Sequence, residues 1–303
     1  LRRAHSSSSN YHNVGIRRAA WSIRDAVRQA CRPERVSIKG IDIVVMGLAA
    51  MDCPTDFVAG RTVARIAGVG KRHVVKHDSV IALYAATLGR PGIVVNAGTG
   101  SFAAGIDRRG SIIRAGGWGN VVDDEGSAYH IGKLAIRAAL RSIDGREKET
   151  VLTRLLKRRF RLRELENIVY DIYSMPITVD ELSTVSELVG KAASMGDRVA
   201  RGIFEYEGRV LANLVAAIAR RLGMTGSKPD VYCIGGVFNA GNVLLGPFRQ
   251  ELHRSIPRFV IRQPRFEPVV GAFILALRER GKMVHGHTLA NLNDSCARLS
   301  LLQ

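Results

Sequence analysis

The fold is decided by the stretch Gly92-Ile93-Val94-Val95-Asn96-Ala97-Gly98-Thr99-Gly100-Ser101. Its apolar first part predicts a buried strand, and the glycines that follow predict a tight turn. Ser101 to Ile106 then has the pattern of a second strand. Backbone N–H groups of a glycine-rich turn at a strand end can approach an anion closely. The stretch therefore has the form of a phosphate-binding β-hairpin, although a purely structural hairpin would use the same glycines.

The segments on either side of this hairpin alternate between strand-like and helix-like patterns, which predicts an α/β protein. Before the hairpin we expect strands at 41–47 and 73–75, and helices at 16–31 and 79–88. After it we expect strands at 231–234 and 259–261, and helices at 124–140, 197–222 and 271–280. The tail after Gly281 is polar and weakly patterned, so we expect it to be loose.

The composition indicates a soluble globular protein. The 303 residues suffice for two domains of ordinary size, and 46% of them are hydrophobic and 24% charged. No apolar run approaches the roughly 20 residues that span a bilayer, and the start of the chain has no apolar signal-peptide core. Four scattered cysteines argue against a zinc knuckle, a redox pair or a disulfide scaffold. We therefore expect a cytoplasmic protein without a membrane partner.

The formal net charge of +18 is compatible with two kinds of partner. Lysine and arginine neutralise the phosphates of nucleic acids, and they also line enzymes that handle anionic substrates. The densest basic run, residues 154–163, alternates with apolar residues at helical spacing and resembles the solvated face of one or two amphipathic helices. No zinc finger or aromatic-studded basic strand accompanies it, so nucleic acid is not favoured.

The stretch Gly116-Gly117-Trp118-Gly119 is followed by three consecutive carboxylates, Asp123-Asp124-Glu125, at a predicted helix start. One carboxylate there could serve only as a helix cap. Three together repel one another unless sugar hydroxyls or a metal pair with them. This combination favours a binding site over simple packing.

Two further strand ends carry candidate site residues. Asp78 lies between an apolar strand and an apolar helix, where it is either a helix N-cap or a general base at the carboxyl end of a strand. Gly235-Gly236 follows the strand 231–234 and either admits the flat face of a nucleotide or simply turns the chain.

Taken together and in this order, these segments resemble the N-acetylglucosamine kinase and archaeal hexokinase group of the BadF/BadG/BcrA/BcrD ATPase family, in the actin-like ATPase superfamily. The resemblance extends from about Ser7 to Leu277. Its marks are the stretches 9–15, 47–52, 77–78, 97–101, 116–119, 124–129 and 234–237.

The resemblance implies an α/β fold of two ribonuclease-H-like domains around a nucleotide- and sugar-binding cleft. On this basis we expect an N-terminal, sugar-side domain at 1–96 and a C-terminal, nucleotide-binding domain at 97–270. A helix at 271–283 is expected to return to the first domain, and 284–303 to form a tail. Relatives with this resemblance suggest a homodimer.

The resemblance also implies roles for individual residues. Asp78 matches the aspartate that takes the proton from the sugar hydroxyl as this hydroxyl attacks the γ-phosphate of ATP. The positions that contact or frame the sugar in similar kinases correspond here to Asn10, Gly117, Trp118 and Asp124. The second phosphate loop corresponds to Gly98, Thr99, Gly100 and Ser101. The adenosine site corresponds to Gly235 and Gly236. Mg²⁺ would bridge the ATP phosphates and keep much of its water shell, with no residue of this chain assigned as its ligand.

One departure from the family pattern concerns the start of the chain. Family members open with a strand, then Asp-Gly-Gly-Gly-Thr-Lys-Thr or a close variant, then a second strand. Here the chain begins with Leu1-Arg2-Arg3-Ala4, and the Asn10 segment follows within a few residues. We therefore expect the first domain to lack this phosphate loop and part of its sheet.

Three functions remain open at this stage. The first is an ATP-dependent sugar kinase that phosphorylates a hexose or N-acetylhexosamine, at O6 by resemblance. The second is an ATPase activator of a dehydratase, which needs cysteines placed for an iron–sulfur cluster; the contexts of Cys53 and Cys233 do not suit it. The third is a protein that senses a sugar or nucleotide without catalysis.

Overall fold

The computed structural model describes residues 2–174, 177–284 and 286–302. Contacts divide the chain into two compact units. The first unit contains residues 1–91, 106–112 and 263–303, and the second contains 92–105 and 113–262. The chain thus leaves the first unit before Gly92, returns to it at residues 106–112, and returns again after Arg262. This division does not test the domain ranges expected from the sequence, which remain a prediction.

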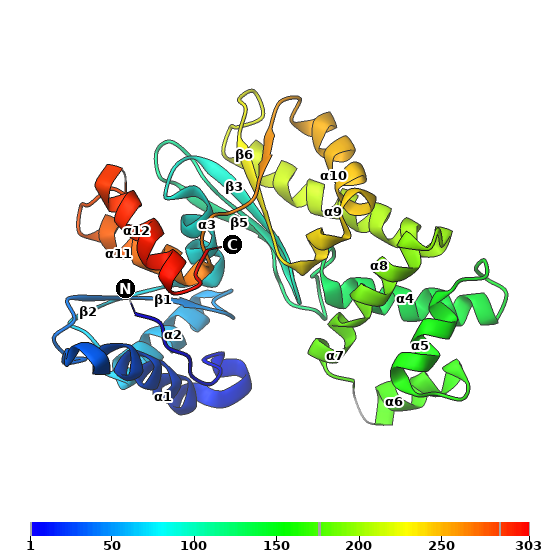
Figure 1. The fold of residues 1–303 in the computed structure, drawn as a ribbon, viewed down its shortest axis with the longest axis horizontal. Helices are drawn as coiled ribbons and strands as arrows, with labels where there is room; N and C mark the ends of the chain where they lie inside the picture. Colours follow the sequence, from blue (N-terminus) through cyan, green and yellow to red (C-terminus); the bar gives the residue numbers. More distant parts are fainter. Residues whose placement is uncertain (1, 175–176, 285, 303) are drawn as a thin grey trace. The chain divides into compact units, whose positions relative to one another are not determined.

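In the first unit, a two-stranded parallel sheet lies beside helices (Figure 1). Ile43 of the first strand lies opposite Arg72 of the second, and the pairing runs to Leu48 and His77. The elements of this unit are α1 (Tyr11–Cys31), η1 (Arg32–Glu34), β1 (Ile43–Leu48), α2 (Pro54–Ala67), β2 (Arg72–His77), α3 (Asp78–Thr87), α11 (Pro268–Glu279) and α12 (Gly286–Arg298).

The core of the first unit forms where α1 and α2 bury small and apolar side chains against the sheet. Ala19 and Ala20 of α1 meet Val63 of α2 and Met46 of β1 in one cluster. Helix α1 begins five residues before the expected Ile16, and it is kinked at Gly15, whose φ of 77° lies outside the helical region. The non-helical residue marks the boundary between the polar first turn and the periodic apolar face that the sequence predicts.

Helices α3 and α11 approach each other closely at Gly271. A Cβ atom at this position would lie 1.8 Å from the backbone oxygen of Ile81 and 2.6 Å from the backbone nitrogen of Ala85. Because both atoms belong to the backbone of α3, they have no rotamer through which to yield. Gly271 therefore sets the separation of the two helices.

The expectation of a loose tail after Gly281 is wrong. Residues 286–298 form α12, and Leu292 and Cys296 on it are buried. Beyond this helix, the backbone nitrogen of Glu267 donates a hydrogen bond to the oxygen of Leu301, and Phe266 forms a bridge with Leu302. The tail is held by these contacts with residues more than thirty positions earlier, which local hydropathy does not reveal.

The second unit is built on a five-stranded sheet in the order β5-β4-β3-β6-β7. Strands β3 and β6 are parallel neighbours, as are β6 and β7. The strands are β3 (Gly92–Ala97), β4 (Ser101–Ile106), β5 (Ile112–Gly116), β6 (Asp230–Ile234) and β7 (Val260–Arg262). The helices of this unit are α4 (Ala128–Ile143), α5 (Leu152–Phe160), η2 (Leu165–Asn167), α6 (Ile168–Ser174), α7 (Val179–Ser183), α8 (Val185–Ser194), α9 (Arg198–Arg221), η3 (Gly236–Ala240) and α10 (Asn242–Ser255).

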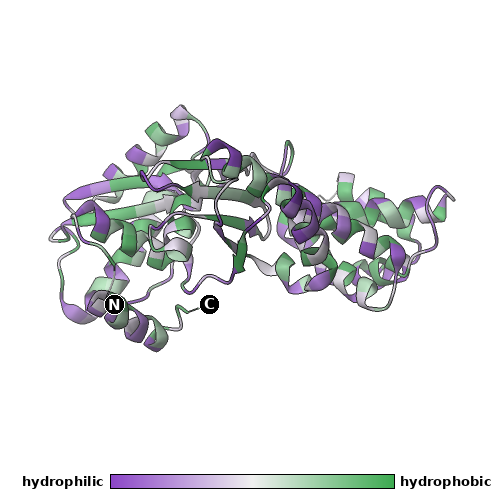
Figure 2. Cartoon of the chain, turned by 90° about the horizontal axis from the view of Figure 1, so that it is seen from above, coloured by the Kyte–Doolittle hydropathy of each residue, from purple (hydrophilic) through white to green (hydrophobic). Residues whose placement is uncertain are grey.

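The helices of the second unit are amphipathic, and hydrophilic and hydrophobic residues alternate around them in Figure 2. Helix α9 buries Phe204, Leu211 and Val215 in the main core and contacts β3 and α10. The basic run of 154–163 lies largely on α5, which buries Leu156 and ends at Phe160, before the C-cap residue Arg161 with a φ of 54°. None of the helices in the described part of the chain has the length and apolarity that crossing a membrane requires.

The predicted helix at 124–140 begins four residues later than expected. Asp124 has a φ of 63° and Gly126 a φ of 89°, so neither can belong to a right-handed helix. Ser127 is the N-cap, and its hydroxyl oxygen accepts a hydrogen bond from the backbone nitrogen of His130. The carboxylates at 123–125 therefore form a turn before the helix, not its first residues.

Gly271→Ala tests the close helix pair. We expect the free energy of unfolding to fall by about 1–3 kcal/mol, because the new methyl group has to displace the backbone of α3. Gly202→Ala on α9 is the control, since a Cβ there meets nothing within 4 Å. That substitution should raise the free energy of unfolding of the unliganded chain by about 0.5–1 kcal/mol. Urea titration measures both, and equal effects would contradict the packing.

Candidate functional site

The glycine-rich turn between β3 and β4 is fixed by hydrogen bonds of its own backbone. The nitrogen of Gly98 donates to the oxygen of Gly100 at 3.0 Å, and the side-chain amide of Asn96 donates to the same oxygen at 3.2 Å. The oxygen of Gly98 accepts from the nitrogen of Ala128 at the start of α4, at 2.8 Å. The turn is thus tied to the helix that follows the acidic segment.

Strand β6 ends directly against this turn. Gly235 has a φ of 100°, and a Cβ atom there would lie 2.3 Å from the oxygen of Ala97 and 2.8 Å from the nitrogen of Gly98. A side chain is therefore excluded, because the neighbouring atoms are all backbone. A Cβ at Gly236, by contrast, would meet nothing within 4 Å, so the next residue faces open space.

Gly98, Thr99 and Gly236 together line a cavity of about 720 Å³. Residues far apart in the sequence, in the turn between β3 and β4 and after β6, thus line one cavity. The other polar side chains of this lining come from the region of α7 and α8 and from η3, and the sequence analysis assigned none of them. These side chains are those of Asp180, Ser183, Thr184, Ser186, Glu187 and Asn239. No motif marks these residues, because they reach the cavity only through the packing of short helices.

Gly100 and Ser101 lie on the other side of the turn. Ser101 is buried, and its hydroxyl donates a hydrogen bond to the backbone oxygen of Glu125 at 2.5 Å. A Cβ at Gly100 would lie 3.0 Å from a carboxylate oxygen of Asp124. In this structure these two residues hold the acidic turn instead of lining the cavity.

The glycine-rich stretch 116–119 forms an open turn that presents Trp118. Gly116, Gly117 and Gly119 all have φ values between 72° and 94°. The indole of Trp118 is 58% exposed, and the guanidinium of Arg114 lies 4.8 Å from its ring centre. Gly117 packs against β4, where a Cβ would lie 3.1 Å from the Cβ of Phe102. An exposed aromatic face fixed beside a strand end is a suitable platform for a flat ligand surface.

Asp124 is buried although it carries a carboxylate. One of its oxygens lies 3.4 Å from the nitrogen of Ser101, which is a long hydrogen bond. Its left-handed backbone conformation costs a non-glycine residue roughly 1–2 kcal/mol, although Asp tolerates it better than most. A buried carboxylate held in this conformation is typical of a binding site.

Glu207 of α9 holds the acidic turn, residues 123–126, in place. The sequence analysis missed this residue. Glu207 is fully buried. One carboxylate oxygen accepts from the nitrogen of Gly126, and the other lies 2.6 Å from Nδ1 of His130. A fully buried carboxylate with both oxygens engaged fixes the backbone that carries Asp124. A lone Glu within an amphipathic helix gives no sequence signal of this role.

In the first unit, Asp78 is the first residue of α3, immediately after β2. The N-cap is His77, not Asp78, since Nδ1 of His77 accepts a hydrogen bond from the nitrogen of Ser79 at 3.0 Å. His77 Nε2 lies 3.5 Å from a carboxylate oxygen of Asp52, which follows β1. The parallel pairing of β1 and β2 thus brings residues from two strand ends together.

The carboxylate of Asp78 has one oxygen without a hydrogen-bond partner. This oxygen, Oδ1, is buried, accepts no hydrogen bond among the described residues, and lies 2.8 Å from Nδ1 of His77, with which it forms an ion pair when that imidazole is protonated. The Asp78 side chain as a whole is 42% exposed. Its exposed atoms, not Oδ1, are therefore the ones that an external hydroxyl group can reach.

Asp56 connects the segment after β1 with the start of α1. Its carboxylate accepts hydrogen bonds from the hydroxyl of Tyr11 and from the nitrogens of Asp52 and Cys53, the latter two at 3.0 and 2.9 Å. The bond from Tyr11 is the main reason why the pKa of Asp56 lies well below its ordinary value. Burial, together with this bond, raises the pKa of Tyr11. The network joins the start of α1 to the segment after β1.

Asn10 caps α1 in this structure. Its side-chain oxygen accepts from the nitrogen of His12 at 3.1 Å, and its own nitrogen donates to the hydroxyl of Ser8 at 3.2 Å. The contact with the helix uses the carbonyl end of the side chain.

The fold and these strand-end sites define an α/β protein of the actin-like ATPase class. Residues 1–276 match the sequence profile of the BadF/BadG/BcrA/BcrD ATPase family, and the chain belongs to this family. Nine-tenths of the sequence is covered, so the match includes both compact units.

Two curated relatives are similar to the chain over most of its length. An N-acetylmuramic acid/N-acetylglucosamine kinase from Clostridium acetobutylicum is 32% identical over 80% of this chain and 79% of its own. An N-acetyl-D-glucosamine kinase from Dictyostelium discoideum is 27% identical over 92% of this chain and 91% of its own.

A solved structure shows the same fold. The crystal structure of a candidate N-acetylglucosamine kinase from Chromobacterium violaceum superposes with a TM-score of 0.73 at 24% identity. The superposition covers 91% of this chain and 90% of the other.

Glu207→Ala tests the anchor of the acidic turn. We expect a loss of about 2–4 kcal/mol in the free energy of unfolding, because the substitution leaves the Gly126 amide and His130 without their buried partner and removes packed atoms. Thermal unfolding measures the loss. Glu205→Ala, an exposed neighbour on the same helix, is the control and should change stability by less than about 0.5 kcal/mol. Similar losses in both would contradict the anchoring role.

The Tyr11–Asp56 bond predicts a pH dependence of stability. Because folding lowers the pKa of Asp56, the unfolded chain binds this proton more tightly. The contribution is complete above the ordinary Asp pKa of about 3.9 and is lost as pH falls toward the folded value. Tyr11→Phe removes the main cause of the shift, so its free energy of unfolding should fall less between about pH 5 and pH 2. Identical pH profiles for the two chains would contradict this account.

Proposed function

We propose that the chain is an ATP-dependent sugar kinase that transfers the γ-phosphate of ATP to a hydroxyl of a hexose or N-acetylhexosamine. The names of both curated relatives support this activity and favour N-acetylglucosamine as substrate. We assign the reaction to O6, the primary hydroxyl, which is the most accessible hydroxyl of a pyranose. The observation that carries the proposal is the partly exposed carboxylate of Asp78 at the end of a parallel strand, where open α/β sheets bind ligands.

For the nucleotide, the proposal uses the cavity beside the glycine-rich turn. Its volume of about 720 Å³ is within the range of small-molecule sites. Thr99 would offer its backbone N–H group to the phosphates, Gly98 without a side chain would let them approach the turn closely, and Gly236 would leave room for the adenosine. Gly100, Ser101 and Gly235 would act behind them, by fixing the turn.

Mg²⁺ is assigned to the phosphates of ATP. In the described ranges, no group of three or more His, Cys, Asp or Glu side chains is arranged to hold a metal ion. Magnesium bound to a nucleotide keeps several waters and needs at most one or two carboxylates from the protein. A magnesium ion that arrives with ATP therefore needs no larger cluster of protein ligands. When bound, it would neutralise charge on the transferred phosphoryl group.

Asp78 would act as the general base. Its side chain is 42% exposed, so the carboxylate can accept a hydrogen bond from a sugar hydroxyl and take its proton as the hydroxyl attacks phosphorus. His77 holds the start of α3 through the Ser79 amide and would keep the carboxylate in place. In this role His77 is a positioning residue.

The sugar is assigned to Trp118, Gly117, Asp124 and Asn10. The exposed face of Trp118 would stack on a pyranose ring, and the buried carboxylate of Asp124 would accept sugar hydroxyls. The close packing of Gly117 would hold the tryptophan in position. Since the carbonyl of Asn10 is engaged as a helix cap, its amide group would be the part that contacts sugar.

Asp78→Asn tests this assignment. We expect kcat for N-acetylglucosamine phosphorylation to fall at least about 100-fold, because the amide cannot take the hydroxyl proton. The dissociation constant of ATP should stay unchanged. Coupled measurement of ADP release, with glucose, glucosamine and mannose compared, gives the rates. Asp294→Asn, an exposed residue on α12, serves as the control.

Turnover by Asp78→Asn at the rate of the parent chain would overturn the role of this carboxylate. Binding of sugar and ATP without turnover in the parent chain would favour a sensing protein instead.

A further inference from the structure

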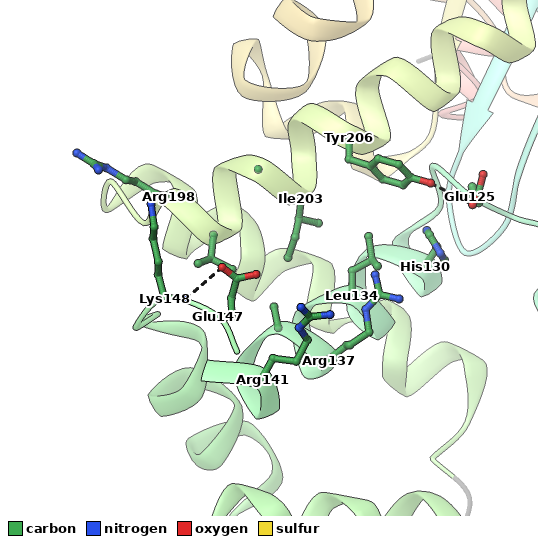
Figure 3. A pocket seen from close by; sticks show the side chains of 13 residues that line it. Glu125, His130, Leu134, Arg137, Arg141, Glu147, Lys148, Arg198, Ile203 and Tyr206 are labelled. Carbon is green, nitrogen blue, oxygen red and sulfur yellow. Dashed lines mark hydrogen bonds between the residues drawn. The ribbon is translucent and has the colours of Figure 1, made fainter. Parts of the chain in front are cut away.

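A second cavity, of about 530 Å³, lies between α4 and α9 of the second unit (Figure 3). It shares no lining residue with the cavity beside the glycine-rich turn. Four basic side chains line it, and none of them belongs to a predicted motif: Arg137, Arg141, Lys148 and Arg198.

Arg137 and Arg141 are four residues apart on α4, so they lie on one face of the helix. Figure 3 shows both guanidinium groups turned toward the cavity. In the described part of the chain, no carboxylate forms an ion pair with either of them. The Nε atom of Arg141 is buried and has no hydrogen-bond partner there, so it lies out of reach of a ligand in the cavity. The two guanidinium groups nevertheless bring positive charge to the cavity that no described carboxylate pairs with, and a bound anion would supply the missing partner.

The rest of the lining suits the uncharged part of a polar ligand. Glu125 and Glu147 offer carboxylate oxygens, and the hydroxyl of Tyr206 donates to Glu125 at 3.2 Å. Leu134, Ala138, Val199 and Ile203 form an apolar side of the cavity. Carboxylates and a phenol hydroxyl bind hydroxyl groups, and an apolar wall accepts the C–H face of a ring.

We propose that this cavity binds a phosphorylated, hydroxyl-rich small molecule of the sugar phosphate class. The phosphoryl group is held by Arg137 and Arg141, since two planar guanidinium groups match the several oxygens of a dianion. Lys148 and Arg198 add positive charge at the rim, and the hydroxyls face Glu125 and Glu147. The volume is that of a small-ligand site, too small for a folded partner.

This cavity borders the acidic turn of the candidate sugar site. The backbone oxygen of Glu125 accepts the hydroxyl of Ser101, and His130, which also lines the cavity, is held by Glu207. A ligand that contacts Glu125 and His130 therefore touches the residues that hold this turn. The inference concerns binding and does not depend on the kinase activity.

The test is isothermal titration of the full chain with three probes: glucose 6-phosphate, inorganic phosphate and glucose. We expect glucose 6-phosphate to bind more tightly than phosphate, and glucose to give the same titration with the parent chain and with Arg137→Gln/Arg141→Gln. In Arg137→Gln/Arg141→Gln, binding of both phosphate probes should weaken at least about tenfold, since two charge-assisted contacts are removed. Arg137→Lys/Arg141→Lys keeps the charge and should retain part of the affinity.

Arg61→Gln/Arg65→Gln is the matched control. This pair has the same spacing on α2, is exposed, and removes the same charge from the other unit. Its affinity for glucose 6-phosphate should equal that of the parent chain, and circular dichroism checks that all variants fold. Unchanged binding in Arg137→Gln/Arg141→Gln, or no binding of either phosphate probe by the parent chain, would overturn the proposal. Equal loss in the control pair would also overturn it, because it would indicate an unspecific charge effect.

Discussion

The close approach of β6 to the turn after β3 is the constraint on which the second unit depends. At Gly235 the backbone leaves no space for a Cβ atom against Ala97 and Gly98. Parallel pairing of β3 and β6 brings these two strand ends to the same edge of the sheet. The glycine at 235 lets them meet, and the open glycine that follows faces the cavity. One backbone contact thus creates the place where a nucleotide is proposed to bind.

The same turn also supports the acidic segment. Ser101 binds the backbone of Glu125 from one side, and Glu207 binds the backbone of Gly126 from the other. Between these anchors, Asp124 is held with a positive φ and a buried carboxylate. This conformation is stable only because α9 and β4 fix both neighbours. The phosphate-side and sugar-side elements of the proposed kinase therefore share one scaffold within the second unit.

The first unit also gathers candidate site residues at the carboxyl ends of parallel strands, on a smaller sheet. Two parallel strands end at one edge, where Asp52, His77 and Asp78 gather. Asp56 ties the segment after β1 to the start of α1. Ligands of open α/β sheets bind at the carboxyl ends of the strands. In both units candidate site residues follow strands: Asp78 follows β2, Gly98 follows β3 and Gly235 follows β6.

Local sequence patterns predicted the strands β1, β2, β3, β4, β6 and β7, the helices α1, α3, α4, α9 and α11, and the glycine-rich turn, because alternation, helical period and glycine act over a few residues. They did not predict β5, α2, α6, α7, α8 or α10. The strand from Ser101 to Ile106 was predicted with its observed bounds. Tertiary contacts alone decided the delayed start of α4, the packing of α12 and the role of Glu207. They also placed α7 and α8 at one cavity and two arginines of α4 at another. A buried carboxylate or an unpaired guanidinium is defined by neighbours distant in the chain, and such neighbours exist only once the helices have packed.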